Sequence, residues 1–158
     1  MVGILFGSRS DADRMQAAAR CLDEFGIPWE AHVLSAHRVP EELERRLAAM
    51  EEAGVKVYIC GAGLAAHLPG VVASKTTRPV IGVPISAKLD GVDALYSIVQ
   101  MPKPIPVAAV GIDNAFNAGM LAVQMLALAD EDLSRRLGEW RIKMKEDFIA
   151  DNGGGVSL

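Results

Sequence analysis

Five short apolar runs recur along the chain, and most are followed by a segment whose apolar residues repeat at helical spacing. The runs at residues 2–6 and 55–60 lack alternation between polar and apolar side chains, which is typical of strands covered on both faces. The other three runs are residues 29–34, 79–83 and 107–110. Strands that alternate with helices predict an α/β fold: a doubly wound five-stranded parallel sheet, most simply a flavodoxin-like three-layer sandwich.

Five segments are predicted to be helical: residues 12–25, 40–53, 91–100, 114–128 and 130–151. Gly26 and Pro28 end the first, and Pro40 suits the first turn of the second. The last helix carries an apolar stripe, which needs a partner surface, formed by Leu133, Leu137, Trp140, Met144 and Phe148. Because the five-strand unit is complete without this helix, we expect it to dock on a neighbouring subunit rather than on its own sheet.

The composition excludes several classes of protein. A chain of 158 residues suits one domain, and a net charge of −4 without basic runs argues against nucleic acid as a partner. No apolar stretch reaches the length of a membrane span, and the first residues lack the pattern of a signal peptide, so we expect a cytoplasmic protein and no membrane partner. The three histidines and two cysteines show no metal-ligand spacing, so no metal is expected.

Residues 35–38, Ser-Ala-His-Arg, stand where a predicted strand meets a predicted helix. Helix N-termini in open α/β sheets bind anions, and Arg38 adds donors suited to a phosphate. His37 exchanges a proton near neutral pH. These residues indicate a phosphorylated small molecule that undergoes proton transfer. The alternative is that Ser35 only caps the helix while His37 and Arg38 are solvated loop residues.

Residues 7–11, Gly-Ser-Arg-Ser-Asp, form a second turn of the same kind. The hydroxyls of Ser8 and Ser10 suit a phosphate, whereas Asp11 would repel a phosphate but suits a sugar diol. A plain helix cap remains the alternative for this turn.

Residues 61–70 form a third turn that is rich in small residues. Gly61, Gly63 and Ala66 match the spacing of a dinucleotide-binding fingerprint, but the motif follows the third strand rather than the first, and no acidic residue ends the next strand. The better interpretation is that small residues let the backbone approach a flat ligand closely. His67 is either a site residue or a structural histidine.

Four segments together resemble the N5-carboxyaminoimidazole ribonucleotide mutase family, the PurE family of purine biosynthesis. The resemblance covers residues 2–128 and rests on residues 7–11, 35–38, 65–70 (Ala-Ala-His-Leu-Pro-Gly) and 96–102 (Tyr-Ser-Ile-Val-Gln-Met-Pro). It implies an isomerase that moves a carboxylate from the exocyclic nitrogen of its substrate to ring carbon C4. It also implies a homo-octamer with sites at subunit contacts, and no cofactor.

The resemblance also implies roles for individual residues. Ser10, Ser35 and Arg38 would hold the phosphate of the nucleotide substrate, and Ser8 and Asp11 its ribose end. His37 would be the general acid and base. Ala36 would also bind the substrate. The base and the transient carbon dioxide would be enclosed by Gly63, Ala65, Ala66, His67 and Leu68. The expected organisation is a catalytic domain over residues 1–128, a docking helix over 129–152 and a flexible tail over 153–158.

Two departures from the family pattern stand out. Leu64 occupies the place of a usual second glycine, which predicts a stiffer or differently shaped loop, and Lys103-Pro104 replaces a glycine-containing step. Two alternative functions stay open. One is direct carboxylation of aminoimidazole ribonucleotide by a related class that typically has Ser-Ala-His-Lys. The other is a nucleotide-binding module without catalysis.

Overall fold

The computed structural model describes residues 1–155, which form a five-stranded parallel sheet. The spatial order is β2-β1-β3-β4-β5, so the predicted flavodoxin-like arrangement is confirmed. All four strand pairs run parallel. The strands are β1 (Val2–Phe6), β2 (Trp29–Val33), β3 (Val57–Gly63), β4 (Val80–Ile85) and β5 (Ala108–Ala109).

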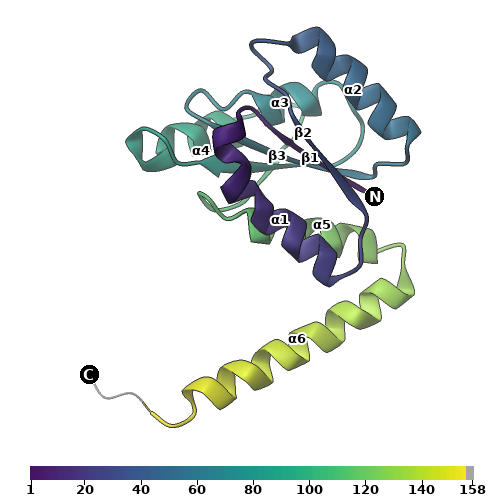
Figure 1. Ribbon diagram of the computed structural model, residues 1–158, viewed down its shortest axis with the longest axis vertical. Coiled ribbons are helices and arrows are strands. Elements are labelled where there is room, and N and C mark those ends of the chain that lie inside the picture. The colour runs from purple at the N-terminus through teal and green to yellow at the C-terminus, as the bar shows by residue number, and fades with distance from the viewer. Residues whose placement is uncertain (156–158) are drawn as a thin grey trace.

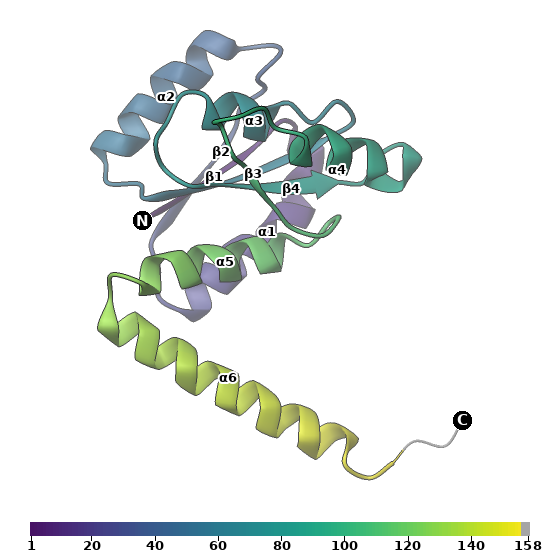
Figure 2. The same cartoon turned by 180° about the vertical axis from the view of Figure 1, so that it is seen from behind.

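Helices cover both faces of the sheet and complete the three predicted layers (Figure 1). One face packs against α1 (Ala12–Glu24) and α5 (Ala115–Ala127). The opposite face packs against α2 (Pro40–Glu52), α3 (Leu68–Ala73) and α4 (Val92–Val99), as the reverse view in Figure 2 also shows. In β1, Ile4 belongs to the first core and Leu5 to the second, which explains why this strand is apolar without alternation.

The third strand corrects the sequence prediction, because it runs to Gly63 instead of ending at Cys60. Gly61 and Gly63 are therefore strand residues, not part of a loop. A Cβ at Gly61 would lie 2.3 Å from Met15 Sδ, so glycine lets α1 pack closely on the sheet. The glycines of a dinucleotide fingerprint open a helix after the first strand, and these do not.

The fourth strand also extends further than predicted, through Pro84 to Ile85. The carbonyl of Pro84 faces the β5 side and accepts a hydrogen bond from the backbone N–H of Asp113 at 2.8 Å. The nitrogen of Pro84 points to the same side, beyond the end of β5, so its missing N–H removes no ladder bond. The predicted flexible connection at residues 84–90 is wrong for its first two residues.

The remaining differences are small. The fifth strand is two residues long instead of four, and every predicted helix begins and ends within one residue of its prediction. One helix, α3, was not predicted from the sequence. This helix spans six residues and contains Pro69 and Gly70, so it is too short to show a helical repeat of apolar residues.

The last helix, α6 (Glu131–Asn152), leaves the body of the domain and extends away from the sheet (Figures 1 and 2). Its first half packs on its own chain: Leu133 is buried, and the Trp140 ring lies 5.9 Å from that of Phe25. Its second half leaves Phe148 and Ile149 about two-thirds exposed. In the predicted flexible tail, residues 156–158 lie outside the described residues. Within residues 1–155, none of the helices has the length and apolar character needed to span a bilayer.

Candidate active site

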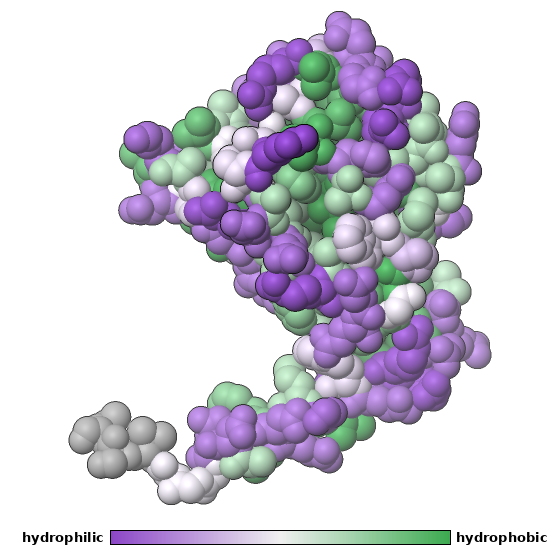
Figure 3. Space-filling view, in the orientation of Figure 1, coloured by the Kyte–Doolittle hydropathy of each residue, from purple (hydrophilic) through white to green (hydrophobic). Residues whose placement is uncertain are grey.

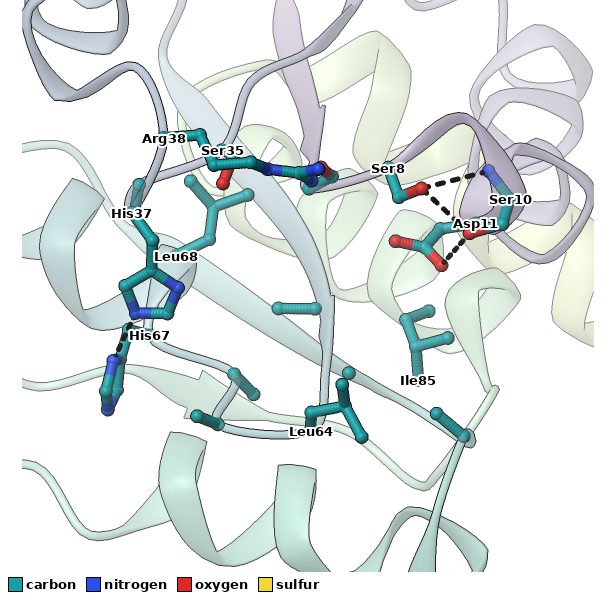
Figure 4. Close-up of a pocket in the computed structure, with 17 residues that line it drawn as sticks. Ser8, Ser10, Asp11, Ser35, His37, Arg38, Leu64, His67, Leu68 and Ile85 are labelled. Atoms are coloured by element: carbon teal, nitrogen blue, oxygen red, sulfur yellow. Dashed lines mark hydrogen bonds between the residues drawn. The ribbon is translucent and has the colours of Figure 1, made fainter.

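The loops that follow β1, β2 and β3, together with the end of β4, surround one pocket at the carboxyl edge of the sheet. Its volume is about 580 Å³, and 17 residues line it (Figure 4). All twelve residues predicted for the site are among them: Ser8, Ser10, Asp11, Ser35, Ala36, His37, Arg38, Gly63, Ala65, Ala66, His67 and Leu68. The structure thus brings together three turns that are far apart in sequence.

Five lining residues were not predicted as site residues: Gly7, Ala62, Leu64, Ile85 and Ala87. Gly7, Ala62 and Leu64 adjoin predicted positions in the same turns, so those motifs could have identified them. Ile85 and Ala87 gave no such signal, because their place depends on β4 continuing through Pro84.

The turn after β1 presents hydroxyl groups at the start of a helix. The Ser8 hydroxyl accepts hydrogen bonds from the backbone N–H of Ser10 at 3.4 Å and from its hydroxyl at 2.9 Å. Ser10 Oγ also lies 3.3 Å from a carboxylate oxygen of Asp11. This cluster combines hydroxyl donors and helix-start N–H groups, which suit an anion, with one carboxylate that suits a diol.

Arg38 links the second turn to the first. Its Nη2 donates a hydrogen bond to the carbonyl of Gly7 at 2.8 Å, and the guanidinium lies between Ser35 and Ser8 in Figure 4. This bond uses only part of the five-donor fork of the side chain. Arg38 is exposed and lines the pocket, so its other donors can reach a phosphate there.

The two histidines of the site contact each other. His37 Nε2 lies 2.6 Å from His67 Nδ1, and the ring centroids are 4.7 Å apart in an edge-to-face arrangement. Such a contact needs a proton on one nitrogen and a lone pair on the other, so the two rings cannot both be doubly protonated. The contact leaves Nδ1 of His37 as the nitrogen that can exchange a proton with a ligand.

Small and apolar residues form the rest of the lining. Ala62, Ala66 and Leu68 are buried, so they offer an apolar wall to a flat ring. Leu64 is half exposed and has a φ of 55°, in the left-handed region that residues other than glycine rarely adopt. The loop at the place of this departure from the family pattern therefore has a strained backbone.

The fourth segment of the resemblance lies outside the pocket lining. Tyr96, on α4, is 60% exposed, and the Met101 side chain approaches Gly70 of α3. Among the described residues, no group of three histidine, cysteine, aspartate or glutamate side chains is placed to hold a metal ion.

Comparison with known proteins identifies close relatives over nearly the whole chain. A sequence model of the family described as AIR carboxylase matches residues 1–147. N5-carboxyaminoimidazole ribonucleotide mutase of Methanocaldococcus jannaschii is 52% identical over 152 residues, which are 96% of this chain and 95% of that protein. The chloroplastic phosphoribosylaminoimidazole carboxylase of Vigna aconitifolia is 48% identical, but the match covers only 27% of its length. The crystal structure of Treponema denticola PurE superposes with a TM-score of 0.88 at 30% identity, covering 97% of this chain and 96% of that one.

Proposed function

This chain belongs to the AIR carboxylase family, and on that premise we propose that it is an N5-carboxyaminoimidazole ribonucleotide mutase. It moves the carboxylate of N5-carboxyaminoimidazole ribonucleotide from the exocyclic nitrogen to ring carbon C4, an isomerisation in purine biosynthesis. The observation that carries the proposal is the shared pocket: the His37 imidazole opens onto the same space as Arg38 and the serine hydroxyls of two turns. An acid/base group and an anion site in one cavity suit a phosphorylated substrate that gains and loses a proton.

Binding of the nucleotide divides between two sets of polar side chains in the pocket. Ser10, Ser35 and Arg38 hold the phosphate through hydroxyl and guanidinium donors. Asp11 and Ser8 hold the ribose end. The support for this division is chemical, because a carboxylate repels a phosphate but accepts hydrogen bonds from ribose hydroxyls.

The reaction needs one proton to be given and one to be taken back. His37 donates a proton to the exocyclic nitrogen as the N–C bond breaks, which releases carbon dioxide and leaves aminoimidazole ribonucleotide. Ring carbon C4 then attacks the carbon dioxide, and His37 removes the C4 proton. The two transfers cancel, so one imidazole can serve both. General acid/base catalysis of this kind contributes about 10²–10⁴ in rate.

His67 fixes which nitrogen of His37 faces the substrate. If Nε2–H of the protonated His37 ring donates to the lone pair of His67 Nδ1, the second proton of His37 is on Nδ1, where it can be given to the substrate, and the neutral ring can then take the C4 proton there. The 2.6 Å contact between the two nitrogens supports this arrangement. Ala65, Ala66 and Leu68 enclose the base, and enclosure retains the carbon dioxide until C4 attacks it.

The enzyme acts as a cytoplasmic homo-octamer in this proposal, as its sequence resemblance implies. The exposed Phe148 and Ile149 on the second half of α6 support docking on a neighbouring subunit, because burying large apolar side chains in an interface removes them from water and stabilises the assembly.

The proposal is tested by supplying two substrates in parallel. We expect efficient conversion of freshly made N5-carboxyaminoimidazole ribonucleotide, and only slow reaction of aminoimidazole ribonucleotide with high bicarbonate. Efficient carboxylation of the second substrate alone would assign the chain to the carboxylase activity named for the Vigna relative. Reaction of neither substrate would contradict both activities.

A further inference from the structure

Asp113 lies between β5 and α5, and its carboxylate binds both the backbone and the side chain of Ser86, the residue that follows β4. One of its carboxylate oxygens accepts a hydrogen bond from the backbone N–H of Ser86 at 2.9 Å, and the other accepts one from the Ser86 hydroxyl. Its own N–H donates to the carbonyl of Pro84 at 2.8 Å. Ser86 stands between Ile85 and Ala87, which both line the pocket. Asp113 therefore holds a segment of pocket wall without lining the pocket itself.

The same carboxylate reaches the opposite wall. Arg14 Nε lies 3.2 Å from Asp113 Oδ1, and Arg14 is in the first turn of α1, directly after the turn that carries Ser10 and Asp11. One side chain thus ties the end of β4 to the start of α1. In Figure 4, Asp11 and Ile85 lie at the same end of the pocket, so this link spans that end.

The charge of Asp113 and its backbone conformation both indicate that the link from Ser86 to Arg14 is held in one geometry. Partial burial alone would raise the pKa of Asp113, but the hydrogen bonds from Ser86 and the nearby Arg14 charge outweigh it and hold that pKa below its usual range. The carboxylate is therefore ionised at neutral pH. The φ of Asp113 is 56°, and such conformations persist where the surroundings over-determine them.

We infer that Asp113 is a positioning residue that sets the separation of the β4 wall from the α1 turn, and thereby shapes the ribose end of the pocket. The inference rests on the proposed function, because it assumes that the nucleotide occupies this cavity. Asp113 acts through Ser86 and Arg14, not by touching the substrate, so its loss should weaken binding more than the chemical steps.

The test compares Asp113→Gly, Asp113→Asn and Arg14→Gln with the wild type. Glycine removes the carboxylate without adding strain at a positive φ. We expect Asp113→Gly to raise KM for the carbamate about tenfold, the scale of one charge-assisted hydrogen bond, with kcat within about twofold. Asp113→Asn should have a smaller effect. Adding Arg14→Gln to Asp113→Asn should change KM no further, since both substitutions break the same pair.

The matched control is Asp23→Asn, which removes the same charge near the far end of α1, about 16 Å along the helix from its start. It should leave KM unchanged. A purely structural Asp113 would lower the melting temperature of Asp113→Gly without moving KM, and that result would overturn the inference.

Amide hydrogen exchange at Ser86 provides a second measurement that needs no substrate. Faster exchange in Asp113→Gly but not in Asp23→Asn supports the link, and unchanged exchange overturns it. An inactive wild type would contradict the proposed function alone, and the exchange result would still decide whether Asp113 holds Ser86 in place.

Discussion

The contact between His37 and His67 joins the proposed acid/base residue to a second imidazole. The two facing nitrogens share one proton. Neither ring is buried, so both are open to a ligand in the pocket. Because His37 takes back one proton for the one that it gives, the pocket needs no other titratable group to return His37 to its starting state after a turnover.

Substituting His37 with asparagine separates binding from catalysis. We expect His37→Asn to bind aminoimidazole ribonucleotide nearly as well as the wild type and to lose about 10²–10⁴ in kcat, because the amide cannot exchange a proton near neutral pH. The measurement is calorimetric binding beside steady-state turnover. His32→Asn is the control, since His32 lies on β2 outside the pocket lining. Unchanged turnover in His37→Asn would remove this residue from the mechanism and favour a binding module.

The strain at Leu64 is measurable with two truncations of the same side chain. Leu64→Gly and Leu64→Ala both remove the leucine side chain beyond Cβ, but only glycine, which also lacks Cβ, adopts a φ of 55° without a steric penalty. The left-handed conformation costs other residues about 1–2 kcal/mol, and the greater freedom of unfolded glycine offsets part of that difference. Denaturant unfolding should show Leu64→Gly more stable than Leu64→Ala by about 1 kcal/mol. Equal stabilities would mean that the loop relaxes out of this conformation.

At the scale of elements, the separation between α1 and the sheet depends on a residue with no side chain. A Cβ at Gly61 would meet Met15 Sδ at 2.3 Å, so α1 can only approach β3 this closely over a glycine. Because α1 also carries the Ser10 and Asp11 turn at its start, this packing contributes to the position of the pocket wall.

The corresponding prediction uses one substitution at two sites. Gly61→Ala should destabilise the protein by about 1–3 kcal/mol through overpacking. Gly138→Ala, in the exposed interior of α6 with nothing within 4 Å of the added Cβ, should stabilise it by up to about 1 kcal/mol through helix propensity. Denaturant unfolding measures both. A neutral Gly61→Ala would show that Met15 moves aside at little cost.

At the scale of the whole molecule, the two halves of α6 differ in how they pack. Its first half is anchored to its own chain: Arg136 donates to the carbonyl of Phe25 at 2.6 Å, and the Trp140 indole donates to Glu24 at 2.6 Å. Its second half presents hydrophilic residues with hydrophobic patches between them (Figure 3). Removing all of α6 would remove the buried Leu133 and expose core residues that α6 covers, such as Phe25, so substitutions in the second half give a cleaner test of assembly.

The double variant Phe148→Ser, Ile149→Ser should assemble into smaller species than the wild type. Burying two such side chains in an interface contributes roughly 3–6 kcal/mol, and serine loses nearly all of it. Light scattering measures the mass. The control is Lys143→Ser, Asp147→Ser, which removes an exposed ion pair from the same part of α6 and should leave assembly unchanged. An unchanged mass in the first variant would exclude docking through these residues.

The local elements and most of the candidate site could be predicted from patterns of neighbouring residues. The apolar runs and helical repeats depend on neighbours within a few residues, so α1 and α2 were predicted to within a residue. Residues 35–38 and 7–11 carried their chemistry in adjacent positions, which is why their place at a shared sheet edge could be anticipated.

Features that depend on contacts between residues far apart in the chain could not be predicted in this way and became visible in the folded structure. Pro84 indicates a break when its neighbours are unknown, yet it extends β4 because β5 has already ended beside it. The pairing of His37 with His67 and the link from Asp113 to Arg14 each join residues from separate βα units. Local pattern cannot specify such contacts, because the register and twist of the assembled sheet set which side chains meet at its edge.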